Sequence, residues 1–253
     1  MSAFLSSLSS LWIYTPLEFA AALAIVMAGG IVRGFTGFGS GLVMVPLLAL
    51  LWGPVEALAA MVGLGSFATL QLIPRAFPMT NWRDVGPMVV GSLALTPVGT
   101  VLLISLDPGV VKKIIAALVL IATIITLRGW VYRGPRGIVP GFISGGLTGL
   151  INGVAGVGGP ATVLYLMALP DKPETHRANI VSAMAFVTIA VFVSMIVAGA
   201  VSARAVTHII VFFIPSFLSI RIGVKMFHVL PSRLFKIIVL WFLIAISLTI
   251  LVA

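Results

Sequence analysis

Residues 30–41 of this chain read GIVRGFTGFGSG, and residues 149–160 read GLINGVAGVGGP. One constant offset of 119 residues (149 − 30) places four glycines of the first stretch on four glycines of the second. The pairs are Gly30 and Gly149, Gly34 and Gly153, Gly37 and Gly156, and Gly39 and Gly158. Without a gap, the same offset pairs Ala49 with Ala168, Pro54 with Pro173, Phe67 with Phe186 and Thr69 with Thr188. A glycine-broken apolar segment at corresponding positions of two halves is typical of a transporter's binding site.

The composition is that of a membrane protein. Of the 253 residues, 60% are hydrophobic and only 8% are charged, and the mean hydropathy is +1.24. Several apolar runs are each about as long as a bilayer-spanning helix; they cover 85–105, 110–127, 180–200 and 234–253. The short alternating segments of an outer-membrane barrel are absent from the sequence. We therefore expect an all-α polytopic protein of the inner membrane, with residues 1–253 forming one transport domain.

Glycine and proline divide the chain into ten apolar pieces, and the basic residues indicate how these pieces cross the membrane. If every break reverses the chain, twelve Lys and Arg fall on one side and three on the other. The twelve are Arg33, Arg75, Arg83, Arg128, Arg133, Arg136, Lys172, Arg177, Arg221, Lys225, Arg233 and Lys236, and the three are Lys112, Lys113 and Arg204. Without reversal this bias disappears. The positive-inside rule therefore favours reversal, with the twelve facing the cytoplasm and both termini outside.

Reversal at every break gives each half of the chain five passes, so the second half starts from the opposite side of the membrane. We therefore predict two inverted repeats, 17–128 and 138–253, each opening with a glycine-broken re-entrant or discontinuous helix pair. The pieces 40–52 and 159–170 are too short to cross a core of about 30 Å at about 1.5 Å per residue. Their glycine tips are expected to lie within the membrane and to meet near its middle.

A helix that starts inside the membrane presents free N–H groups and a partial positive charge, and two such starts facing each other would suit an oxyanion. The predicted substrate-binding residues come from both glycine stretches and the start of the piece that follows the second. They are Arg33, Gly34, Thr36, Gly37, Gly39, Ser40, Gly41, Asn152, Gly153, Gly156, Gly158, Gly159 and Thr162. Arg33 is the only Lys or Arg in either stretch, and Asn152 stands at the equivalent position. Candidates to line the pathway are Gln71, Asn179 and Ser182.

These assignments have structural alternatives. Glycines recur at every fourth position from Gly141 to Gly153, which favours close helix packing over ligand contact. The tip glycines suit either ligand contact or the geometry of a hairpin alone. Arg33 suits an anchor at the membrane surface as well as an anion clamp, and Ser40 and Asn152 suit caps for the half-helix amides. The three pathway candidates could instead hydrogen-bond within or between helices.

The acidic residues all fall near predicted helix ends; they are Glu18, Glu56, Asp84, Asp107, Asp171 and Glu174. Cation sites and carboxylate proton relays normally need a carboxylate in mid-membrane, so a metal-cation transporter is disfavoured. A weak-acid anion could still carry its own proton. With no cysteine and only three scattered histidines, the sequence predicts no metal site and no cofactor. It also has no nucleophile–base pair and no Walker-type loop, so it predicts no catalytic residue and no enzyme.

The doubled motif, the length and the span pattern resemble the sulfite exporter TauE/SafE family. The matching residues are 34–41 (GFTGFGSG) with Pro46, and 149–160 followed by 171–179 (DKPETHRAN). The resemblance runs from about Leu17 to the end of the chain. Members of the family are linked to export of sulfite and to movement of organosulfur compounds such as sulfonates and sulfoacetate. The resemblance therefore implies an inner-membrane anion permease.

Three functions fit these observations. The first is a secondary transporter or facilitator for a small sulfur-containing anion (sulfite, sulfonate or sulfoacetate type), in which one repeat rocks against the other. The second is an anion channel of the same architecture, and the third is a non-transporting membrane subunit. The expected partners are the small anion and the lipid bilayer, with proton coupling and a homo-oligomer left open. Nucleic acid is not expected, because the basic residues lie in short loops where orientation signals belong.

Overall fold

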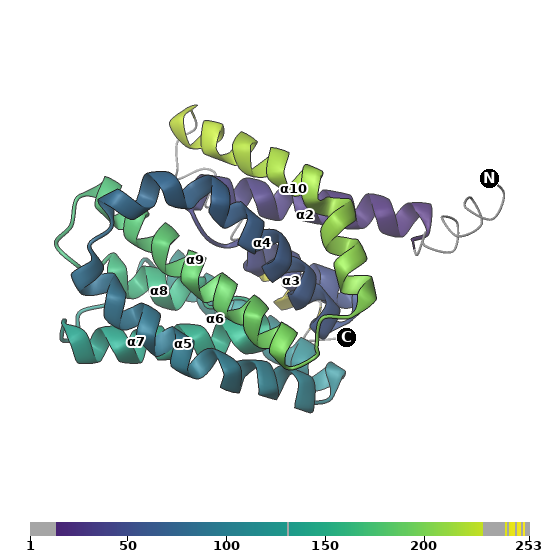
Figure 1. Ribbon diagram of the computed structural model, residues 1–253, viewed down its shortest axis with the longest axis horizontal. Coiled ribbons are helices and arrows are strands. Elements are labelled where there is room, and N and C mark those ends of the chain that lie inside the picture. Colours follow the sequence, from purple (N-terminus) through teal and green to yellow (C-terminus); the bar gives the residue numbers. More distant parts are fainter. Residues whose placement is uncertain are drawn as a thin grey trace.

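The computed structural model describes residues 14–130 and 132–229, together with Trp241, 243–245, 247–248 and Ile250. Every regular element within these ranges is a helix (Figure 1). The helices are α2 (Pro16–Thr36), α3 (Ser40–Trp52), α4 (Pro54–Ala76), η1 (Phe77–Met79), α5 (Trp82–Ser105), α6 (Pro108–Leu127), α7 (Ile138–Ala155), α8 (Gly159–Leu166), α9 (Pro173–Val197) and α10 (Ala203–Val229). In the described part of the chain, seven helices are long and apolar enough to cross a membrane. The all-α, multi-pass prediction is confirmed, and the predicted piece 234–253 lies for the most part outside the described residues.

Both glycine stretches break a helix at residues that need glycine. Gly37 follows the end of α2 with a φ of 85°, and Gly39 precedes the start of α3 with a φ of 87°. Gly156 follows the end of α7 with a φ of 68°, and α8 begins three residues later. A side chain is strained in this left-handed region, so glycine marks each break.

The helix bounds keep the offset found in the sequence. α7 ends 119 residues after α2 (155 − 36), α8 begins 119 residues after α3 (159 − 40), and α9 begins 119 residues after α4 (173 − 54). α3 has 13 residues and α8 has 8, which makes them about 20 Å and about 12 Å long. Both are therefore shorter than a hydrocarbon core of about 30 Å.

Two pairs of helices pack with their backbones in contact. Along α5 and α7, a Cβ built on Gly145 or Gly149 would meet a backbone carbonyl of α5. Along α2 and α10, a Cβ built on Gly34 or Gly223 would meet a backbone carbonyl of the facing helix. Figure 1 shows α10 lying along α2, and α7 beside α5. The four-residue glycine spacing in α7 thus serves close helix packing.

The main apolar core surrounds α3. It joins residues of α2, α3, α4, α6 and α10, among them Val26, Leu48, Leu58, Val119 and Phe212. Large apolar side chains also cover the outside of the helices, as expected for a surface that faces lipid. Examples are Leu70 (69% exposed), Leu93 (48%), Ile143 (64%), Ile210 (69%) and Ile214 (65%).

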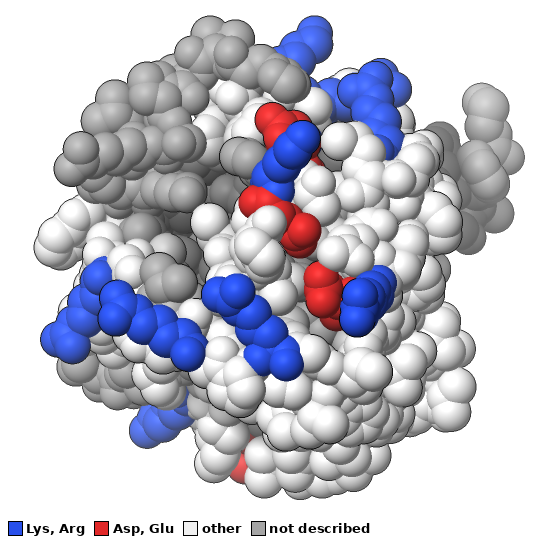
Figure 2. Space-filling view, turned by 90° about the vertical axis from the view of Figure 1, so that its left-hand side faces the viewer, with Lys and Arg blue, Asp and Glu red and all other residues white. Residues whose placement is uncertain are grey.

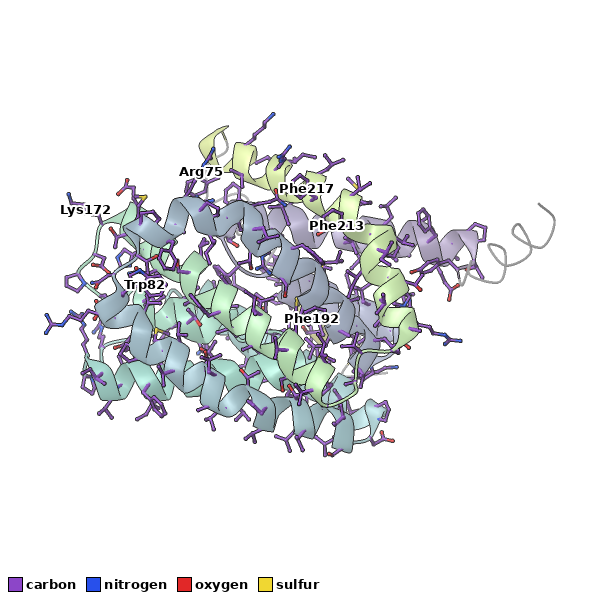
Figure 3. The ribbon with its side chains drawn as sticks, viewed as in Figure 1. Arg75, Trp82, Lys172, Phe192, Phe213 and Phe217 are labelled. Carbon is purple, nitrogen blue, oxygen red and sulfur yellow. The ribbon has the colours of Figure 1, made fainter. Side chains whose placement is uncertain are left out.

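Basic side chains gather at one end of the molecule, where α4, α6 and α8 end and α5, α7 and α9 begin; we call this the basic end. Figure 2 faces it and shows Lys and Arg spread across it, and Figure 3 labels Arg75 and Lys172 there. Lys112, Lys113 and Arg204 lie in the first turns of α6 and α10, at the opposite end. The position of Arg33 differs from the sequence-based prediction, which counted it among the twelve basic residues on the cytoplasmic side. The residue is only 5% exposed, because it lies on α2 inside the protein rather than in a surface loop.

Candidate functional site

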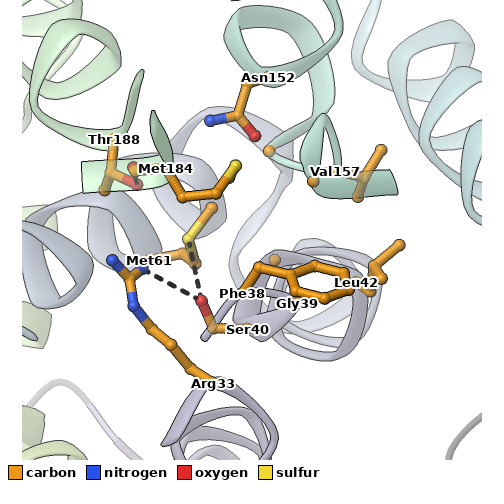
Figure 4. Close-up of a pocket in the computed structure, with 13 residues that line it drawn as sticks. Arg33, Phe38, Gly39, Ser40, Leu42, Met61, Asn152, Val157, Met184 and Thr188 are labelled. Carbon is orange, nitrogen blue, oxygen red and sulfur yellow. Dashed lines mark hydrogen bonds between the residues drawn. The ribbon is translucent and has the colours of Figure 1, made fainter. Parts of the chain in front are cut away.

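A small cavity lies where the two glycine breaks meet (Figure 4). Seven of the predicted site residues line it: Arg33, Gly39, Ser40, Gly41, Asn152, Gly156 and Gly159. Six lining residues were not predicted: Phe38, Leu42, Met61, Val157, Met184 and Thr188. Met61 comes from α4, and Met184 and Thr188 come from α9, so helices outside the glycine stretches complete the wall. A sequence signal for Thr188 existed, because the offset of 119 pairs it with Thr69.

The two breaks touch each other directly. A Cβ built on Gly41 would collide with the carbonyl group of Gly156. One built on Gly159 would lie 2.7 Å from Cδ2 of Phe38. The absence of side chains at these positions lets the starts of α3 and α8 approach the same point.

Arg33 supplies a buried positive charge to the cavity. Its Nη1 donates a 3.4 Å hydrogen bond to Oγ of Ser40, and its Nε has no hydrogen-bond partner. Among the residues that the structure describes, no carboxylate lies within ion-pair distance of Arg33. Only 5% of Arg33 is exposed, so the residue is enclosed by protein.

Hydrogen bonds shape the breaks, but no side chain caps the first turn of α3 or of α8. No side chain caps the N-terminal amides of α3, and Oγ of Ser40 instead lies 3.9 Å from Sδ of Met61. On the other side, Oδ1 of Asn152 accepts a 3.1 Å hydrogen bond from the backbone N–H of Gly158. Asn152 therefore holds the second break in shape, while the first turns of both half-helices keep N–H groups without a side-chain cap.

The cavity is small. Its volume is about 10 Å³, which is room for about one water. Figure 4 shows Met61 and Met184 on one side of the space and the ring of Phe38 on another. Methionine is flexible and fills irregular gaps, so these side chains are the ones whose movement would open the cavity.

Six predicted site residues lie outside this lining: Gly34, Thr36, Gly37, Gly153, Gly158 and Thr162. Gly34 packs against α10, and its carbonyl accepts a 3.2 Å hydrogen bond from Nη2 of Arg177. Gly153 packs against α5, so that a Cβ at this position would lie 2.6 Å from the carbonyl oxygen of Thr96. Thr36 accepts from the N–H of Phe38 at 3.2 Å, and Thr162 donates to Thr148 at 3.1 Å. The threonines thus hold the breaks together.

The three pathway candidates also lie away from the cavity lining. Oδ1 of Asn179 accepts a 2.7 Å hydrogen bond from the N–H of Asn81, and Ser182 shares a 2.7 Å hydrogen bond with Thr80. Both residues of α9 therefore hydrogen-bond the segment where α5 begins. This is the alternative to pathway lining, in which these side chains bond between helices. Gln71 lies in α4, and its Nε2 has no partner within the described ranges. No group of three or more His, Cys, Asp or Glu that could hold a metal occurs among the described residues.

These features define a multi-pass helical membrane protein whose broken helices enclose a cationic cavity. The sequence profile of the family described as "Sulfite exporter TauE/SafE" matches residues 21–250. The chain therefore belongs to the sulfite exporter TauE/SafE family, whose members are membrane exporters and not enzymes.

A relative is the "Probable sulfite/organosulfonate exporter TauE" of Cupriavidus necator, which is 27% identical over 164 residues. The match covers 62% of this chain and spans 64% of the length of that relative. No solved structure matches this chain.

Proposed function

We propose that this protein is a secondary transporter that moves a small sulfur oxyanion or sulfonate, bound between the breaks at 34–41 and 153–160. One observation carries the proposal: Arg33 is buried without a carboxylate among the described residues. Burial of an unpaired charge costs several kcal/mol, so an anionic partner at this place would be strongly favoured. The relative from Cupriavidus necator, named as a sulfite/organosulfonate exporter, supports the choice of anion.

The chemistry of the cavity suits an oxyanion. A guanidinium presents several N–H groups in one plane and can bind two oxygens of the same anion. The first turn of α3 offers N–H groups that no side chain caps, and these favour negative charge. The hydroxyl of Ser40 lies beside the guanidinium, so one anion could contact the charge, the hydroxyl and the amides together.

The architecture that we propose is two inverted repeats, 17–128 and 138–253, with α3 and α8 as re-entrant half-helices. Support comes from the helix bounds that recur at an offset of 119 residues. Support also comes from the pairing of helices, because α2 packs on α10 as α7 packs on α5, and α4 packs on α9. We further propose that the basic end faces the cytoplasm of a cell with the protein in its inner membrane, as the positive-inside rule favours.

The small size of the cavity supports a carrier over an open channel. Room for about one water is too little for a sulfur oxyanion, so the anion needs a conformational change to enter and leave. Counterflow tests this part of the proposal: substrate on the far side of a proteoliposome should speed uptake by a carrier. A channel would show no such stimulation.

The binding site is tested by thermal unfolding of detergent-purified protein with sulfite, sulfate, thiosulfate, taurine, sulfoacetate, acetate, phosphate and chloride at matched ionic strength. An anion that binds the native state raises the melting temperature by mass action. We expect a selective rise with one sulfur anion, lost in Arg33→Gln and kept in the control Arg75→Gln, which removes an exposed Arg. An undiminished rise in Arg33→Gln would place the site elsewhere. No rise with any anion would favour the non-transporting subunit.

A further inference from the structure

Four side chains from separate segments meet at the end opposite the basic end. Tyr14 precedes α2, Trp52 ends α3, Glu56 lies in the first turn of α4, and His208 lies near the start of α10. The hydroxyl of Tyr14 hydrogen-bonds Nδ1 of His208, and Nε2 of His208 lies 3.7 Å from Oε2 of Glu56. Trp52 stacks on the imidazole, with ring centroids 3.7 Å apart and ring planes 6° apart.

His208 is a buried titratable group that the proposed anion site does not use. The residue is 2% exposed, and its Nε2 has no hydrogen-bond partner in the described part of the chain. At 3.7 Å, Glu56 is too far for a hydrogen bond, yet close enough to attract a charged imidazole. Glu56 is itself 24% exposed, so the cluster has contact with solvent through this carboxylate.

We infer that His208 and Glu56 form a proton-binding site that, when protonated, holds the connection between α3 and α4 against the start of α10. We call this contact the latch. Uptake of one proton from solvent converts neutral His208 into an imidazolium with an N–H on each ring nitrogen. One N–H then points to the oxygen of Tyr14 and the other to the carboxylate of Glu56. The new ion pair, together with the cation–π attraction of Trp52, holds the three segments together. Release of the proton removes both attractions.

The other ionisable groups nearby do not take this role. Glu18 of α2 accepts a 2.8 Å hydrogen bond from the backbone N–H of Thr15 at the start of its own helix. Arg204 lies one turn before His208 and is exposed. Burial, with the charge of Glu56 adding to it, raises the pKa of Tyr14 to about 12, so Tyr14 keeps its proton throughout the physiological range. The proton that is gained or lost therefore sits on His208.

The latch reaches the anion cavity through α3, and in this step it rests on the proposed function. α3 runs from Ser40 in the cavity wall to Trp52 on the face of His208. A displacement of one end of this short helix therefore moves the other. The offset of 119 residues places Thr175 opposite Glu56 and Val89 opposite His208. The positions that the offset pairs with Glu56 and His208 therefore hold no such pair, so protonation would favour one of the two access states over the other.

Tryptophan fluorescence tests proton binding without any transport assay, because an imidazolium in contact with an indole quenches its emission. Purified protein should lose emission as the pH is lowered from about 8 and His208 takes up a proton. The loss should vanish in Trp52→Phe and in His208→Gln, and persist in His176→Gln, which alters a histidine of α9 as control. Quenching that persists in His208→Gln, or that is missing from the wild type, would overturn the proton site.

Spin labels test the latch itself. The chain has no cysteine, so Leu50→Cys on α3 (51% exposed) and Ala203→Cys at the exposed start of α10 can be labelled as a single pair. We expect a shorter and narrower distance distribution at about pH 5.5 than at about pH 8. The pH dependence should be lost in His208→Gln and, as an independent variant, in Glu56→Gln. A distribution that does not change across the midpoint of quenching would overturn the latch.

Neither experiment contains a substrate anion. A cavity that binds no sulfur anion would therefore overturn the proposed function and leave the proton site standing. Conversely, anion binding that depends on Arg33 together with no quenching at Trp52 would overturn only the latch.

Discussion

The guanidinium of Arg33 occupies space that Gly65 leaves open. A Cβ built on Gly65 would lie 2.7 Å from Nη1 of Arg33 and 2.9 Å from Cγ2 of Thr188. Gly65 is buried in α4, and Thr188 belongs to α9. The absence of a side chain at one position of α4 therefore lets the cation lie between two helices at the wall of the cavity.

Gly65→Ala should displace the guanidinium and weaken anion binding. A distance of 2.7 Å is too short for a real Cβ contact, and the far end of an arginine is the part that can move away. We expect sulfite affinity, measured by titration of the purified protein, to fall by about tenfold, which corresponds to about 1.4 kcal/mol.

Gly86→Ala in α5 is the matched control for this change, because a Cβ at Gly86 would have no atom within 4 Å. It adds the same methyl group to a helix and should leave sulfite affinity unchanged. Equal affinity of both variants would show that the position of Arg33 does not determine binding.

Two substitutions of Asn152 separate the effect of its hydrogen bond on stability from the effect of charge on anion binding. Asn152→Ala removes the oxygen that accepts from the N–H of Gly158, so it should lower the melting temperature, at a cost of about 1 kcal/mol for a lost hydrogen bond. Asn152→Asp keeps an acceptor but adds a negative charge to the cavity that holds Arg33. We expect Asn152→Asp to retain the fold, measured by thermal unfolding. Its affinity for sulfite should fall by more than tenfold, because repulsion between the new carboxylate and the anion costs more than about 1.4 kcal/mol of binding free energy. Strong sulfite binding by Asn152→Asp would contradict an anion in this cavity.

Gly149→Leu should separate α7 from α5. A Cβ at this position would lie 2.8 Å from Cα of Ser92, and backbone cannot move aside as a side chain can. Overpacking of this kind costs about 1–3 kcal/mol, and we expect a melting temperature lower by about 5 °C. Leu147→Ala, at a 49% exposed position of the same helix, should change it far less. A larger effect of Leu147→Ala would contradict tight packing at Gly149.

Single cysteines test the orientation of the protein, since the native chain has none. Lys113→Cys lies in α6 at the end opposite the basic end, and Arg136→Cys lies at the basic end; both positions are exposed. A thiol reagent that does not cross membranes should label Lys113→Cys in intact cells and Arg136→Cys only after the cells are opened. The reverse pattern would place the basic end outside.

The breaks in the helices could be predicted from the sequence because their cause is local. A backbone with positive φ requires glycine, so Gly37, Gly39 and Gly156 mark the ends of α2 and α7 without reference to the rest of the fold. The predicted piece 159–170 likewise begins where α8 begins. The role of Arg33 could not be decided in this way, because an apolar neighbourhood is compatible with the membrane surface and with the interior.

The rest of the cavity depends on how distant helices cross. Met61 and Met184 lie in ordinary apolar helices, and nothing in their local sequence distinguishes them from methionines that pack elsewhere. Gly34 and Gly153 are among the predicted substrate contacts, and the four-residue spacing also favoured packing for Gly153. Both pack against a helix from the other half of the chain. Glycine serves close packing and ligand contact for the same physical reason, so its spacing alone does not separate the two roles.

The two glycine-lined contacts link the halves of the chain in a crossed manner. α2 of the first half is joined to α10 of the second, and α7 of the second half is joined to α5 of the first. Carbonyl-to-glycine contact leaves no room for one helix to slide along the other. In the proposed transport cycle we therefore expect these pairs to move as units, in place of one repeat rocking against the other. Neither half, produced alone, would have a partner for its own glycine face.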